Sequence, residues 1–204
     1  MSNLLMSYEL LDYNQDMIKE SREKFGGKIR LKGIMQKSDT LNQNGRVYPR
    51  DILEREIRNY QKFIVENRAL GEADHPESSV VNIKNVSHIV KECYMDDKGV
   101  VYGTIELLDT PSGKIIQSLI ESGVKLGISS RGLGSTKKQG DHVIVQEDFQ
   151  LICFDMVTEP STTQAFMLPE GRRLGSTSSE NLILTRSDKI DRVMNDIITV
   201  KRRK

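Results

Sequence analysis

The part of this sequence that decides its fold is residues 126–135, which read LGISSRGLGS. Three serines and three glycines fall within these ten residues, directly after a segment with the pattern of a helix. A turn needs only one or two glycines, and a linker would not have apolar residues on both sides. We therefore predict a strand over residues 127–133, flexible enough to present a serine hydroxyl at a turn.

Apolar periodicity predicts the elements on both sides of this stretch. A helix opens at Pro49, and a second one runs from Pro111 to a stop at Ser122 and Gly123. Alternating apolar residues predict further strands over residues 28–36, 86–94, 99–108 and 150–158. A hairpin at 96–99 joins the second of these strands to the third, and another hairpin element lies at 143–145. Strands dominate and no βαβ repeat is visible, which favours a barrel-like α+β domain.

Length and charge restrict the class of protein. The 204 residues suffice for one domain with tails, which we divide into an arm (1–27), a domain (28–170) and a flexible linker with a tail (171–204). The 30 basic and 29 acidic residues give no field that selects nucleic acid or an anionic membrane. No apolar run has the length of a membrane span, so we expect a soluble protein inside the cell.

Among the three histidines, His75 is the candidate for chemistry. It lies in an irregular segment after a helix, where functional groups are often found, although an exposed loop histidine is the simpler interpretation of the residue alone. His88 lies inside an apolar alternation, which favours a buried structural role. His142 follows Gly140 and Asp141 in a hairpin tip, where contact with water is expected.

A histidine base needs a nucleophile and usually an orienting acid. Ser129 and Ser130 are the candidate nucleophiles, and nearby glycines could leave the backbone amides of Arg131 and Gly132 free to face an oxyanion. Asp155 is a lone carboxylate in an apolar strand, so it needs a specific partner. That partner is either the histidine or, in the simpler alternative, the backbone or an arginine.

Other chemistries have weaker support. The order histidine, serine, aspartate matches none of the common triads, and the Gly-x-Ser-x-Gly elbow is absent. The phosphate-binding loop and the metal-binding histidine motifs are absent as well. The two cysteines, Cys93 and Cys153, stand in apolar contexts and are expected to be buried. We expect neither a metal nor a cofactor.

Four motifs together carry a resemblance to a known family: NGRVYP (44–49), ALGEADHP (69–76), GISSRG (127–132) and FDMVTEPS (154–161). In this order they resemble the prohead core proteases of large contractile-tailed bacteriophages, which are similar in fold to herpesvirus assemblins. The resemblance runs from about Lys28 to Phe166.

The resemblance implies a serine endopeptidase on a mostly antiparallel β-barrel surrounded by helices. It would act inside the viral procapsid in the host cytoplasm, on scaffolding core and capsid proteins. It implies a catalytic triad of His75, Ser130 and Asp155, with Ser129 as the alternate nucleophile. The third residue in assemblins is a histidine, so Asp155 departs from their pattern. An aspartate would still stabilise the imidazolium formed during attack.

Proteases of this family prefer to cut after glutamate preceded two residues earlier by leucine or isoleucine. Such sites end at Glu170 and Glu20, and a weaker one ends at Glu9. We expect a zymogen that removes its own ends at these sites, with the arm as a possible inhibitor of the active site. The same pattern at residues 119–121 lies in a predicted helix, which shows that chance matches occur.

We expect a homo-oligomer, of which a ring is one form, with no need for a membrane or nucleic acid. The alternative function is a catalytically silent scaffold or tube-like assembly protein on the same barrel. Binding of nucleic acid through the basic residues 201–204 has less support. Contact between His75 and Ser130 would separate the enzyme from the scaffold.

Overall fold

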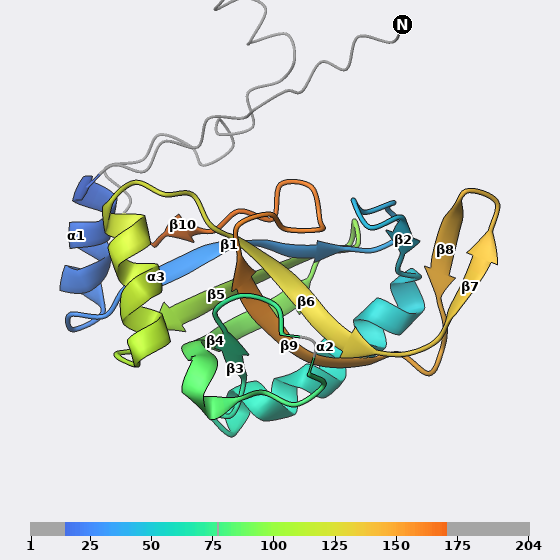
Figure 1. The fold of residues 1–204 in the computed structure, drawn as a ribbon, viewed down its shortest axis with the longest axis horizontal. Coiled ribbons are helices and arrows are strands. Elements are labelled where there is room, and N and C mark those ends of the chain that lie inside the picture. Colours follow the sequence, from blue (N-terminus) through green and yellow to red (C-terminus); the bar gives the residue numbers. More distant parts are fainter. Residues whose placement is uncertain (1–14, 77, 171–204) are drawn as a thin grey trace, which may run out of the picture. The chain divides into compact units, whose positions relative to one another are not determined.

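The computed structural model describes residues 15–76 and 78–170, which form a mixed α+β fold with mostly antiparallel sheets (Figure 1). The described helices are α1 (Gln15–Lys24), α2 (Arg50–Val65), the 3-10 helix η1 (Ile83–Asn85) and α3 (Pro111–Glu121). The strands are β1 (Arg30–Lys37), β2 (Arg46–Val47), β3 (Leu70–Glu72), β4 (Val86–Met95), β5 (Val100–Leu107), β6 (Gly127–Leu133), β7 (Thr136–Gln139), β8 (His142–Val145), β9 (Gln150–Val157) and β10 (Leu168–Pro169).

The largest sheet has five strands in the order β10-β1-β5-β4-β3, and all its neighbours are antiparallel. The hairpin between β4 and β5 is the one predicted from the sequence. Its turn is closed by Asp96, whose Oδ1 accepts hydrogen bonds from the amides of Lys98 and Val100. Gly99 has φ +77°, a backbone conformation that favours glycine.

The closed barrel that we expected is not present among the described residues. β6 and β9 form a separate two-stranded sheet, and β2, β8 and β7 form a third. Single bridges join β6 and β9 to other segments, Gly127 to Phe166 and Ala73 to Met156. Because the outer edges of β6 and β9 meet these short segments instead of long strands, the hydrogen-bonded ladder stops before it closes.

The helices α2 and α3 agree with the sequence prediction. α2 packs its apolar face toward the sheets, and the ring of Tyr60 meets Phe154 of β9 edge-on at 5.6 Å between centroids. α3 has Thr110 as its N-cap, with the hydroxyl accepting from the Gly113 amide at 3.0 Å. Gly123, with φ +81°, follows the end of α3. No helix within the described ranges is long and apolar enough to cross a membrane.

The second half of the expected N-terminal arm is packed against the domain. Ile18 of α1 is buried in the core, and the Ser21 hydroxyl accepts from the Arg30 amide at 3.0 Å. Lys24 forms an ion pair with Glu170, with 2.9 Å between Nζ and Oε1. Residues 1–14, which include Glu9, and the linker and tail beyond Glu170 lie outside the described residues.

Residues 127–133 of the stretch form the strand β6, so the predicted strand is confirmed, but the expected turn that presents a serine is wrong. A Cβ atom at Gly127 would collide with Pro160, and one at Gly132 or Gly134 would collide with Phe149. The glycines therefore allow close packing of the protein on itself. The following segment is β7 in a hairpin with β8.

Candidate active site

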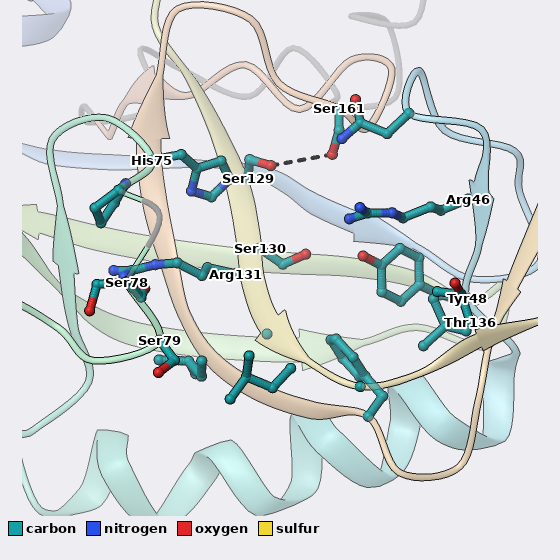
Figure 2. A pocket seen from close by; sticks show the side chains of 18 residues that line it. Arg46, Tyr48, His75, Ser78, Ser79, Ser129, Ser130, Arg131, Thr136 and Ser161 are labelled. Atoms are coloured by element: carbon teal, nitrogen blue, oxygen red, sulfur yellow. Dashed lines mark hydrogen bonds between the residues drawn. The ribbon is translucent and has the colours of Figure 1, made fainter.

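A pocket of about 490 Å³ lies beside β6, between the loop that follows β3 and the sheet of β2, β8 and β7 (Figure 2). His75 lines one side of it, and Arg46 and Tyr48 line the other. Ser129 and Ser130 lie between them on β6. The pocket is also lined by Ser161, so it brings together residues from all four motifs found in the sequence.

His75 is held in place by the backbone around it. Asp74 has φ +68°, and its amide donates to the Met156 carbonyl of β9 at 2.8 Å. The Asp74 carboxylate accepts from the His75 amide at 2.8 Å. The imidazole Nδ1 lies 2.8 Å from Asp155 Oδ2, and the His75 side chain is 37% exposed. Since a carboxylate accepts hydrogen bonds, we assign the proton to Nδ1, which leaves Nε2 as an acceptor.

Asp155 is fully buried and has several donors around its carboxylate. Oδ2 accepts from Arg131 Nε at 2.8 Å as well as from His75, and Oδ1 accepts from the Glu72 amide at 3.0 Å. Burial alone would raise the pKa of Asp155, but hydrogen bonds from His75, Arg131 and the Glu72 amide outweigh it and lower the pKa. Both partners considered for Asp155, the histidine and the arginine with the backbone, are therefore present together.

Arg131 links Asp155 to a second buried carboxylate. Its Nη2 donates to Glu72 Oε1 at 2.7 Å and to Asp155 Oδ1 at 3.2 Å, and its Nη1 donates to the Ser78 carbonyl at 2.6 Å. Burial opposes the charge of Arg131, but the hydrogen bonds to Asp155 and Glu72 outweigh it and raise the pKa of the guanidinium. Arg131 is therefore a charged bridge between β3 and β9.

The two serines occupy different positions relative to Asp155. In the β6–β9 ladder Ser129 is directly opposite Asp155, and Ser130 is opposite Phe154. Residues paired in this way point to the same face, and neighbours along a strand point to opposite faces. Ser129 therefore shares a face with Asp155, and Ser130 does not.

Each serine hydroxyl has a partner in this structure. Ser129 Oγ lies 3.2 Å from Ser161 Oγ (Figure 2). Ser130 Oγ donates to Gln36 Oε1 at 2.6 Å. Within the described residues no hydrogen bond joins His75 to either serine. The structure thus brings His75 and Asp155 together and places both serines in the same pocket.

The amides expected to face an oxyanion differ in their surroundings. The Ile128 amide donates to Ala165 and so points away from β9. By alternation the Arg131 amide points toward β9, where Arg131 is paired with Cys153. The pairing then shifts and Gly132 faces Leu151, so Ile152 of β9 is left unpaired in a β-bulge opposite Arg131 and Gly132. Because a bulge disrupts the ladder, the geometry favours Gly132 over Arg131 as a free donor.

His88 has the structural role predicted for it. It is fully buried, its Nε2 is 3.0 Å from the Phe154 carbonyl, and its Nδ1 is 2.9 Å from Ser87 Oγ. Burial lowers the pKa of His88 to about 4, so the ring is neutral at neutral pH. Cys93 and Cys153 are buried and unbonded to each other, as expected.

The side of the pocket away from His75 carries hydrogen-bond donors. Arg46 is exposed and has no carboxylate partner among the described residues. The Tyr48 hydroxyl likewise has no hydrogen-bond partner among them. In Figure 2 the guanidinium of Arg46 and the hydroxyl of Tyr48 both point toward Ser130. This end of the pocket can therefore bind an acidic group.

The candidate self-cleavage sites in the described residues are in ordered elements. Leu168 pairs with Lys32 of β1, and the Glu170 amide donates to the Arg30 carbonyl at 2.8 Å. Glu20 lies within α1. Cleavage at either site requires local opening, because the segment must leave its β-pairing or its helix to enter the pocket. No residue of α1 lines the pocket, so the described part of the arm leaves it uncovered.

Sequence reasoning missed several contributors to the site. The side chain of Arg131 and the carboxylate of Glu72 were inside recognised motifs but had no assigned role. Gln36, the partner of Ser130, lies in β1, far away in the sequence. A charged residue inside a mostly buried strand, as at Arg131, was the signal that could have identified the ion pair.

Comparisons with known proteins identify the family of this chain. Residues 10–175 match the family described as prohead core protein serine protease. The chain is 32% identical over 145 residues to the prohead core protein protease of Enterobacteria phage T4, covering 69% of this chain and 68% of that protein. The fold is similar to the structure of the bacteriophage T4 capsid assembly protease, with a TM-score of 0.61, 29% sequence identity, and coverage of 64% of this chain and 82% of that one. Since the family match spans more than half of the sequence, this chain belongs to the prohead core protein serine protease family.

Proposed function

We propose that this chain is a serine endopeptidase of a phage procapsid, which cleaves scaffolding core and capsid proteins during head maturation in the host cell. Family membership supports the peptidase activity and the procapsid setting. The observation that carries the catalytic proposal is the 2.8 Å contact between His75 Nδ1 and Asp155 Oδ2, with Ser129 directly opposite Asp155.

The proposed triad is His75, Asp155 and Ser129. The ladder register supports Ser129 over Ser130, our first choice from the sequence, because only Ser129 shares a face with Asp155. The Ser129 hydroxyl would leave Ser161 by rotation about χ1 to approach Nε2 of His75. Hydrogen bonds in resting sites are often loose and tighten when substrate binds.

In the first half of the reaction Nε2 of His75 takes the proton of Ser129 as Oγ attacks the scissile carbonyl carbon. Asp155 holds the ring in the required tautomer and stabilises the imidazolium. The imidazolium then gives the proton to the leaving amine, which departs and leaves an acyl group on Ser129. Water hydrolyses that ester by the same steps with His75 as base, and the serine is restored.

The tetrahedral intermediate carries a negative oxygen, and we propose the backbone amide of Gly132 as one of its donors. The bulge at Ile152 of β9, opposite this residue, supports the assignment, since it interrupts the pairing of β6 with β9. An oxyanion donor is worth about 10²–10³ in rate in known enzymes. Arg131, the other amide expected from the sequence, has less support because it points toward β9.

The expected preference for glutamate agrees with the hydrogen-bond donors on the side of the pocket away from His75. Arg46 and the Tyr48 hydroxyl could bind the carboxylate of a substrate residue beside the nucleophile (Figure 2). An amide in place of the carboxylate would lose the charge-assisted bond to Arg46. We therefore propose cleavage after glutamate, with leucine or isoleucine two residues earlier as in the family.

We further propose that the chain is a zymogen that removes its own ends after Glu170, Glu20 and Glu9. The first two sites are held in β-pairing and in α1, which would slow their cleavage until they open. A homo-oligomer, in which one subunit cuts the end of another, would suit such processing.

A catalytically silent scaffold is the second candidate, since both serine hydroxyls are bonded to groups other than His75. Incubating the chain with a Leu-x-Glu peptide, and with a Leu-x-Gln peptide for comparison, would decide between the enzyme and the scaffold. For the enzyme we expect cleavage of the glutamate peptide and covalent labelling of Ser129 by a fluorophosphonate probe, mapped by mass spectrometry. No cleavage and no labelling, in the full chain and in chain trimmed after residue 170, would support the scaffold.

A further inference from the structure

Two buried carboxylates share one arginine beside the proposed catalytic histidine. Glu72 and Asp155 are both fully buried, and Arg131 donates to both through Nη2. Glu72 makes no contact with His75, so the mechanism above does not use its charge. Its place in a buried ion-pair network nevertheless fixes the net charge around Asp155.

The other buried titratable groups near Asp155 are uncharged at neutral pH, and the charged groups nearby are exposed to solvent. Burial lowers the pKa of His88 to about 4 and raises the pKa of the Cys153 thiol above its usual range. Burial likewise raises the pKa of the Tyr60 phenol. On the loop of His75 itself, Asp74 is exposed to solvent, and its carboxylate faces the backbone amide. Across the pocket Arg46 is exposed to solvent, which screens its charge.

The charges that remain are those of Glu72, Arg131 and Asp155, and they sum to −1 + 1 − 1 = −1 while His75 is neutral. When His75 takes the serine proton, the sum becomes zero. Without the charge of Glu72 the same step would take the cluster from zero to +1. A net positive charge is unfavourable in a cluster whose members other than His75 are buried.

We propose that Glu72 is a positioning residue of the protease, which acts through Arg131 to keep the Asp155 site negative, so that the imidazolium of His75 forms within a neutral cluster. This inference rests on the proposed function. Without Glu72, Arg131 would neutralise Asp155 and weaken its attraction for the imidazolium. The negative charge of Glu72 thus offsets the positive charge of Arg131, which orients the carboxylate of Asp155.

The bonds of Glu72 allow its charge to be tested separately from its shape. Its Oε1 accepts from Arg131 Nη2 at 2.7 Å and from the Asn82 amide at 2.9 Å, whereas Oε2 is buried without a partner. In Glu72→Gln the amide oxygen can accept the same two bonds, and the NH₂ group takes the place of the unpartnered oxygen. The substitution therefore removes the charge with little change in shape.

The test is the pH dependence of kcat/KM on the Leu-x-Glu peptide, using the full chain. For Glu72→Gln we expect the acid midpoint of activity to fall by roughly one pH unit and the plateau rate to fall about tenfold, because the imidazolium is less stabilised. For Arg131→Gln, which leaves a charge of −2, the midpoint should rise. In the double variant Asp155 alone supplies the −1, and the midpoint should return toward that of the wild type.

Glu106→Gln is the matched control, because it removes an equal charge from a part-buried pair with Arg30 outside the pocket and should leave the midpoint unchanged. A lower thermal midpoint in Glu72→Gln with an unmoved acid midpoint would overturn the proposal and leave Glu72 a structural role. If Glu72→Gln does not fold, an unchanged acid midpoint of activity in Arg131→Gln would also overturn the proposal. A wild-type chain that neither cleaves the peptide nor reacts with the fluorophosphonate would overturn the proposed function itself.

Discussion

Ser129 on β6 is paired directly with Asp155 on β9, and the carboxylate of Asp155 also bonds the imidazole of His75 at 2.8 Å. This pairing separates two serines that are neighbours in the sequence. Ser129 shares the face of the carboxylate, whereas Ser130 points to the other face and donates to Gln36. The proposed role of Ser129 as the nucleophile depends on this difference.

Replacing the acid of the triad should impair the chemical step. In Asp155→Asn we expect kcat to fall about 10⁴-fold with little change in KM, because the amide cannot hold His75 in the required tautomer. Steady-state kinetics on the Leu-x-Glu peptide would measure this, with circular dichroism to verify folding. A folded variant with less than a tenfold loss would show that Asp155 serves the ion pair with Arg131 alone.

Arg46 should determine the preference for an acidic substrate residue. In Arg46→Gln we expect the ratio of kcat/KM for glutamate and glutamine peptides to fall about 10-fold to 100-fold, since a charge-assisted hydrogen bond is lost. Arg58→Gln, on the exposed face of α2, is the control and should keep the wild-type ratio. An unchanged ratio in Arg46→Gln would place the acidic subsite elsewhere.

Gly132 should be intolerant of a side chain. In Gly132→Ala the new methyl group meets the ring of Phe149 and the Gln150 carbonyl, and we expect a loss of about 1–3 kcal/mol in the free energy of unfolding. A double-mutant cycle with Phe149→Ala, measured by denaturant unfolding, checks the cause. Strict additivity of the two losses would mean that the ring is not the obstacle.

His88 should make the protein less stable as the pH falls. Its pKa is about 4 in the folded protein and 6.5 in the reference state, so between these values only the unfolded chain binds the proton. Stability is therefore lost as the pH falls from 6.5 toward 4. From pH 7 to pH 5 we expect this site to lower the free energy of unfolding by about 2 kcal/mol, a change that should be absent in His88→Gln. An equal pH dependence in both chains would refute this.

Lys24 should protect the junction after the domain. Its ion pair with Glu170 is partly exposed and is worth little energy, so in Lys24→Ala we expect self-cleavage after Glu170 to be about 2-fold to 5-fold faster. Lys28→Ala is the control, because Lys28 pairs with Asp109 instead. Intact mass measured over time would give both rates. Equal rates in the two variants would mean that the pair does not restrain the site.

The long elements of this fold could be predicted from the sequence because each buries one face and shows its period. The helix after Pro49, the helix from Pro111 and the β4–β5 hairpin were found in this way. The short strands β2, β3 and β10 were not, because two or three residues carry no period and pair only through tertiary contacts. Closure of the barrel was wrongly expected, because closure depends on which strand edges pair, and that pairing is also set by tertiary contacts.

The candidate site was predictable in its residue types and less so in its geometry. A buried carboxylate needs partners, so Asp155 could be expected to have some, but the sequence could not show that it has both His75 and Arg131. The choice between Ser129 and Ser130 depends on strand register, and a shift of one residue exchanges the two faces. Only the pairing of β6 with β9 distinguishes them.

The most direct test of the central claim is intact mass spectrometry of wild-type chain, Ser129→Ala and Ser130→Ala, each incubated at high concentration over hours. We predict that wild type and Ser130→Ala lose the residues after Glu170, and that Ser129→Ala stays whole by itself but is trimmed when a trace of wild-type chain is added. Trimming of Ser129→Ala alone, together with an intact Ser130→Ala, would contradict the assignment of the nucleophile.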